Sequence, residues 1–108
     1  MTVNKELMKG STATLVLTLL ARKEMYGYQI IKELEVVSSG LFEMKEGTLY
    51  PILHALEQSE AVVATWVGEE GTRQRKYYAI TKQGRALLKA KKEEWRNFKE
   101  TVDKVLQG

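Results

Sequence analysis

The chain has 108 residues, 44% of them hydrophobic and 29% charged, which is the composition of one soluble domain with a modest core. It has no cysteine, which excludes disulfide bonds and fits a reducing compartment. No apolar run reaches the roughly 20 residues of a membrane-spanning helix, and the start of the chain lacks the basic segment and apolar block of a signal peptide. We therefore expect a cytoplasmic protein that does not bind membranes, and a domain this small would gain stability from an oligomer interface.

The net charge of +3 is unevenly distributed along the chain. Residues 1–60 carry six lysines and arginines against eight acidic residues, whereas residues 61–108 carry eleven against six. This polarity suits a face that binds a polyanion, and on charge alone it suits a solvated lysine-rich helix about equally well.

Helical periodicity predicts two helices in the first part of the chain. From Lys5 to about Arg22 the apolar residues cover most of the circumference of a helix, so this segment is expected to be buried on more than one side. A second, amphipathic helix is predicted from about Tyr26 to Val37, with Ser38–Gly40 as its stop signal.

A third, short helix is predicted because four apolar residues recur at helical spacing on one face. These residues are Leu49, Ile52, Leu53 and Leu56. Their face must point inward, so the polar residues between them lie on the other sides of the helix. Pro51 is expected near the first turn, where its missing N–H costs no intrahelical hydrogen bond.

A hairpin and a long helix are predicted to follow. Ala61–Val67 and Arg73–Thr81 are rich in β-branched and aromatic residues and flank the turn sequence GEEGT, which indicates a two-stranded hairpin. Thr81 can cap a last helix that runs to about Leu106. The apolar positions of this helix follow a heptad-like spacing and form a short seam. They are Leu88, Trp95, Phe98, Val102 and Val105.

The predicted order is helix, helix, helix, strand, strand, helix, so the chain is expected to be mainly α with a small β-hairpin (α+β). A helix pair, a third helix and a basic hairpin form a winged helix-turn-helix, in which the third helix enters the major groove of DNA and the hairpin, called the wing, lies along the phosphate backbone. We assign residues 1–81 to a winged helix-turn-helix DNA-binding domain and residues 82–108 to a C-terminal dimerisation helix in the same compact unit.

The third helix and the wing supply the candidate contacts to double-stranded DNA. Outward-facing residues near the N-terminal end of the helix can bind base edges or phosphates, or can leave room for DNA to approach. They are Thr48, Tyr50, Pro51 and His54. For Tyr50 or His54 alone, packing against a neighbouring loop explains the residue equally well.

In the wing, the basic residues Arg73, Arg75 and Lys76 are clustered. Strand alternation sends both arginines to one face and Lys76 to the other, whereas Tyr78 and Ile80 are assigned to the core. A basic hairpin alone is more often solvated surface than a binding site. Together with the preceding helix-turn-helix, it favours nucleic-acid binding.

Trp95 has two compatible interpretations. The simpler one, which the sequence favours, is that Trp95 fills a subunit interface with the other seam residues, because a large aromatic side chain contributes strongly there. The second is that Trp95 side chains from two crossing helices sandwich a flat aromatic molecule, with Met8 and Thr12 of the first helix completing the pocket.

Catalytic and metal sites are not predicted. The chain has one histidine, no cysteine and no glycine-rich phosphate loop after a strand, and His54 alone lacks partner ligands for zinc. We therefore expect no enzyme, no metal and no cofactor. The rival hypothesis is a winged helix that binds protein instead of DNA. An acidic or apolar wing would favour protein binding. The Arg-Gln-Arg-Lys cluster of the wing argues against it, whereas the acidic Glu69 and Glu70 keep this alternative open.

Six stretches of the chain form a specific combination. They are KG at Lys9–Gly10, YGYQIIKEL at Tyr26–Leu34, SGLFEMKEGTLYPILHALE at Ser39–Glu57, RKYYAIT at Arg75–Thr81, GR at Gly84–Arg85 and EEW at Glu93–Trp95. Together they resemble the PadR family of bacterial transcriptional regulators over nearly the whole chain. The single C-terminal helix resembles the smaller PadR subfamily, which includes repressors that respond to drugs or other aromatic compounds.

The resemblance implies a homodimer that joins through its last and first helices and represses transcription from a near-palindromic operator. It also implies release from DNA when a planar hydrophobic molecule binds at the dimer centre beside a tryptophan placed like Trp95. Two features depart from the family pattern. Gln58–Val63 lacks the usual glycine after the third helix, so Ser59 and Glu60 must form that turn, and the two acids of the wing loop weaken the expected phosphate contacts.

Overall fold

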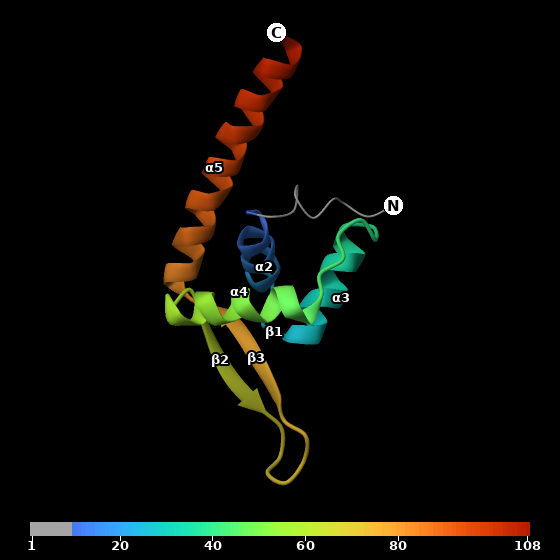
Figure 1. The fold of residues 1–108 in the computed structure, drawn as a ribbon. Helices are drawn as coiled ribbons and strands as arrows, with labels where there is room; N and C mark the ends of the chain where they lie inside the picture. Colours follow the sequence, from blue (N-terminus) through green and yellow to red (C-terminus); the bar gives the residue numbers. More distant parts are fainter. Residues whose placement is uncertain (1–9) are drawn as a thin grey trace.

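The computed structural model describes residues 10–108. Over these residues the chain forms four helices and a three-stranded antiparallel sheet (Figure 1), which confirms the predicted α+β class. The elements are α2 (Thr12–Leu20), β1 (Met25–Tyr26), α3 (Gly27–Val37), α4 (Glu46–Gln58), β2 (Val62–Val67), β3 (Arg75–Ile80) and α5 (Lys82–Gln107).

The sheet has one strand more than the predicted hairpin. β1 pairs with β3 in antiparallel register, with Met25 opposite Tyr78 and Tyr26 opposite Tyr77, and the strand order is β1-β3-β2. A strand of two residues has no periodicity of its own, so the sequence pattern does not reveal it. Because Tyr26 is also the N-cap of α3, this strand ties the start of α3 to the base of the wing.

α2 is shorter than the helix predicted from Lys5 to about Arg22. Gly10 lies in a turn with a φ of +89°, a left-handed conformation that an α-helix cannot contain, so the prediction of one continuous helix is wrong. Residues 5–9 lie outside the described residues. α2 itself contacts α3, α4, α5 and β3, which confirms that this segment is buried on more than one side.

The core lies where α2 meets the other helices and the inner face of the sheet. Its largest fully buried side chains are Leu17, Leu20, Met25, Ile30, Leu49, Leu53 and Val16. In α4, Leu49, Leu53 and Leu56 are buried and Ile52 packs partly against the core, as the helical spacing predicts. The opposite face of α4 is left free, and this is the face that positions the candidate site.

The turn after α4 is formed by Ser59 and Glu60, as predicted. Glu60 has a φ of +63°, and the Ala61 N–H donates to the Leu56 carbonyl at 2.9 Å while the Glu60 N–H donates to the Glu57 carbonyl at 3.0 Å. These two bonds form a Schellman motif, whose left-handed residue is usually glycine. Glutamate therefore holds a strained conformation at this position.

α5 begins at the predicted cap and extends far beyond the body. The Thr81 Oγ1 accepts a hydrogen bond from the Gly84 N–H at 3.0 Å, and a Cβ at Gly84 would collide with the Ala61 carbonyl. With 26 residues, α5 is about 39 Å long. Only its first part packs against the body, and the rest projects away from it (Figure 1).

Candidate nucleic-acid interface

The four residues predicted to face DNA from the third helix are all exposed on α4. They are Thr48, Tyr50, Pro51 and His54. All four lie away from the buried Leu49 and Leu53. α4 therefore presents hydroxyl, phenol and imidazole groups to solvent on the face opposite the core, and such groups can donate to or accept from base edges and phosphates.

Tyr50 is the most constrained of the four. Its side chain is 44% exposed, yet its ring packs against Gly27, the first residue of α3, where a Cβ would collide with the phenol hydroxyl. Burial raises the pKa of Tyr50 above its usual 10.0, and Glu46 and Tyr78 add to the increase. The hydroxyl thus remains protonated at neutral pH and can donate a hydrogen bond.

Pro51 lies further into the helix than predicted. Because α4 begins at Glu46, Pro51 falls in the second turn, and the Gly47 carbonyl cannot receive the usual hydrogen bond from the residue four positions later. Gly47 and Pro51 are both exposed, so water can solvate this carbonyl. The exposed face of α4 therefore also carries a backbone acceptor without a helical donor.

The basic residues of the wing divide between its two faces. Lys76 lies on the face toward α4, where its Nζ donates to Glu57 Oε1 at 3.3 Å. Partial burial lowers the pKa of Lys76, but the hydrogen bond and charge of Glu57, together with Tyr78, outweigh this and raise the pKa above its usual 10.5. Tyr78, on the same face, is buried as predicted.

Arg75 lies on the opposite face of the wing. Its guanidinium is 4.5 Å from the centre of the Tyr26 ring, which in turn packs edge-on against Tyr77 at 5.4 Å. This cation–π contact and the aromatic pair hold the arginine at the base of the wing. Arg73 precedes β3 and is exposed in the wing loop. The three basic residues therefore reach different sides of one hairpin.

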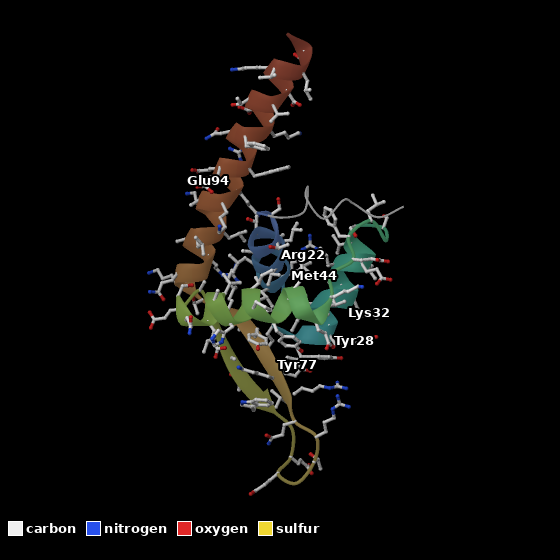
Figure 2. The ribbon with its side chains drawn as sticks, viewed as in Figure 1. Arg22, Tyr28, Lys32, Met44, Tyr77 and Glu94 are labelled. Carbon is white, nitrogen blue, oxygen red and sulfur yellow. The ribbon has the colours of Figure 1, made fainter. Side chains whose placement is uncertain are left out.

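α3 carries an exposed aromatic–cation pair, Tyr28 and Lys32, that is not among the residues predicted from the sequence. Tyr28 is 52% exposed, and the Lys32 Nζ lies 5.5 Å above its ring. Figure 2 shows Tyr28 at the end of α3 that lies near Tyr77 and the base of the wing, with Lys32 about one turn further along the helix. An aromatic residue and a lysine four positions apart on a helix lie side by side, so this spacing in the sequence could have revealed the pair.

α5 carries the predicted seam, with one change. Trp95, Phe98 and Val105 are 54%, 61% and 74% exposed, and the Trp95 and Phe98 rings lie 6.0 Å apart. Val102 is partly exposed. Leu88, predicted as part of the dimer interface, is instead 5% exposed in the chain's own core, because the first part of α5 packs against α2, and it has little surface left for a partner.

The residues predicted to line a ligand pocket are only partly described. Thr12 begins α2 and is partly exposed, whereas Met8 lies outside the described residues. Within residues 10–108, no three potential metal ligands cluster, and no helix is long and apolar enough to cross a membrane.

Comparison with known proteins gives a consistent result. Residues 16–90 match the transcriptional regulator PadR-like family. The uncharacterized protein X of Lysinibacillus sphaericus is 33% identical over 106 residues, which cover 98% of this chain and 97% of that protein. The transcriptional regulator YqjI of Escherichia coli is 29% identical over 86% of this chain, which spans 43% of that protein.

Solved structures extend this similarity to the fold. A transcriptional regulator from Clostridium thermocellum superposes with a TM-score of 0.86 at 35% identity, covering 92% of this chain and 96% of the other. A PadR family transcriptional regulator from Eggerthella lenta superposes with a TM-score of 0.82 at 32% identity, and the match covers 94% of this chain and 86% of the other. The family match and these similar structures agree with the exposed polar face of α4 and the basic wing. The chain belongs to the PadR-like family of transcriptional regulators.

Proposed function

We propose that the protein is a homodimeric repressor that binds a near-palindromic operator and is released by a small planar aromatic or hydrophobic ligand. The observation that carries the proposal is the pairing of two free surfaces on one chain. One is the polar face of α4 beside the basic wing, and the other is the apolar seam on the projecting part of α5.

The α4 face supports insertion into the major groove. Its outward residues Thr48, Tyr50 and His54 bear hydrogen-bonding groups, and Pro51 keeps the surface between them free of a long side chain. Arg75 and Arg73 of the wing supply charge for the phosphate backbone, which dominates affinity, while the α4 side chains read base edges. Lys76 contributes less, since Glu57 partly neutralises it.

The α5 seam supports the dimer. A set of large apolar side chains this exposed on a solvated helix marks an interaction surface. One winged helix reads one half-site, and useful specificity needs two recognition helices about one helical turn of DNA apart, roughly 34 Å. Pairing of Trp95, Phe98, Val102 and Val105 between two chains would set that separation.

Ligand release follows if the seam also forms a pocket. The tilted Trp95 and Phe98 rings present flat apolar surface, with Thr12 and Met8 as further proposed wall residues. A ligand shifts the protein off DNA only if it binds better to a dimer whose helices are spaced wrongly for the operator. The release step is therefore a population shift that depends on differential affinity.

The test is selection of fragments bound by the full chain from the source genome, combined with light scattering of the free protein. Enrichment of a two-fold symmetric site and a dimeric mass are expected. A dimer that enriches no sequence would favour the rival function, a winged helix that binds protein, and a monomer would contradict the assignment of the α5 seam.

A further inference from the structure

Trp66 is a large aromatic side chain that the fold leaves uncovered near the end of the wing. It is 62% exposed in β2. The register of β2 and β3 places Trp66 opposite Lys76, and Ala64 opposite Tyr78. Residues paired directly across an antiparallel ladder point to the same face of the sheet. Trp66 therefore shares its face with Lys76 and Tyr78.

This face of the sheet is the one that lies against α4. At the base of the wing Tyr78 is buried in the core, and one step outward Lys76 reaches Glu57 of α4. At the same level of the ladder, directly opposite Lys76, Trp66 lies beyond the core on the same side of the wing as α4. Val67, its neighbour in β2, pairs with Arg75 and points to the opposite face.

We infer that Trp66 is a DNA-contacting residue of the wing, whose indole packs against the sugar–phosphate backbone beside the groove that α4 enters. The inference rests on the proposed function. An indole offers a flat apolar surface to a deoxyribose and one N–H donor to a phosphate oxygen. Lys76, which Glu57 neutralises only in part, leaves some positive charge on the same face, and a phosphate backbone is the complementary partner.

An uncharged contact of this kind has a signature that separates it from the basic residues. Removing a lysine or arginine that binds phosphate reduces the number of counterions released and flattens the salt dependence of binding. Removing an indole leaves that number unchanged. Loss of Trp66 should therefore weaken binding at every salt concentration by the same factor.

The experiment compares the full-length wild type with Trp66→Ala, Trp66→Phe and the matched control Val67→Ala. Each is titrated by fluorescence anisotropy against a duplex of random sequence about three helical turns long, roughly 32 base pairs, over a series of salt concentrations. The titration is repeated with any fragment that genomic selection recovers. Thermal unfolding of each variant reports whether the wing hairpin still folds.

The expected result is that Trp66→Ala weakens binding about tenfold, with an unchanged salt slope and an unchanged melting temperature. Trp66→Phe should retain most of the affinity, and Val67→Ala all of it. Wild-type affinity in Trp66→Ala would overturn the inference and leave the proposed function standing. Equal losses in Trp66→Ala and Val67→Ala, or a loss matched by unfolding, would also overturn it. Failure of the wild type to bind any duplex would overturn both.

Discussion

Tyr50 of α4 rests on Gly27, the first residue of α3, so closely that any side chain at position 27 would meet the phenol ring. The contact joins the two helices of the helix-turn-helix and fixes a phenol that is still 44% exposed. A side chain held in its binding position before DNA arrives loses less conformational freedom on binding. Because Gly27 has no side chain, it leaves room for the Tyr50 ring and so holds this residue of the recognition face in position.

Gly27→Ala should weaken operator binding roughly tenfold, as expected for loss of one specific contact. The new methyl group displaces the Tyr50 ring, while alanine is intrinsically better than glycine in a helix, so the free energy of unfolding should change by less than about 1 kcal/mol. Gel-shift titration and thermal unfolding measure the two quantities.

The control for this effect is a double-mutant cycle. Tyr50→Ala alone should weaken operator binding without unfolding the protein, and Gly27→Ala added to it should cost nothing more, because both changes remove the same contact. Additive losses would show that Gly27 acts by another route. Unchanged binding in Tyr50→Ala would remove Tyr50 from the interface.

The wing offers a second test, based on charge. Alanine at Arg73, Arg75 and Lys76 should weaken binding to all duplexes and flatten the salt dependence. Among single variants, Arg75→Ala should flatten the slope by about one unit and Lys76→Ala by less, because Lys76 is already paired with Glu57. Affinity measured from low to high salt gives each slope.

Glu57→Gln is the matched control for the wing. It removes an acid and frees Lys76, so binding should strengthen and the salt slope should steepen, while this partly exposed ion pair costs less than about 1 kcal/mol of stability when lost. Weaker binding in Glu57→Gln would mean that the ion pair serves to position the wing. A triple alanine variant with the wild-type slope would refute the role of the wing altogether.

The strained turn after α4 predicts a stabilising substitution. Glu60→Gly should raise the free energy of unfolding by about 1 kcal/mol, because glycine adopts the left-handed conformation without strain and the Schellman hydrogen bonds are retained. Gln58→Gly, two residues earlier at the last residue of α4, should instead destabilise the protein, by at most about 1 kcal/mol. Chemical denaturation measures both, and a destabilised Glu60→Gly would show that the glutamate side chain stabilises this turn.

Tryptophan fluorescence tests the pocket proposed on α5. Planar aromatic compounds should quench the emission of the wild type, and quenching should be lost in Trp95→Phe. Trp66 contributes to the same signal, so Trp66→Phe serves as the control and should keep the ligand response. Quenching that survives Trp95→Phe would argue against Trp95 as a wall of the pocket.

The sequence predicts those features that depend on periodicity and local chemistry. The spacing of Leu49, Leu53 and Leu56 fixes which side of α4 is free, and Thr81 marks the start of α5. Several of the features that it missed depend on pairing between residues distant in the sequence. β1 is too short to have a period, and the Glu57–Lys76 ion pair follows only from the packing of the wing on α4. Leu88 fits the heptad seam, but its burial depends on the proximity of α2.

The most direct test of the account is a hydroxyl-radical footprint of the full chain on a selected genomic fragment, read together with the mass of the complex. Two chains per duplex should protect two symmetric half-sites whose centres lie about one helical turn apart, roughly 10 base pairs. A single protected half-site bound by one chain would contradict the account. So would the absence of protection at protein concentrations that bind the fragment in a gel shift.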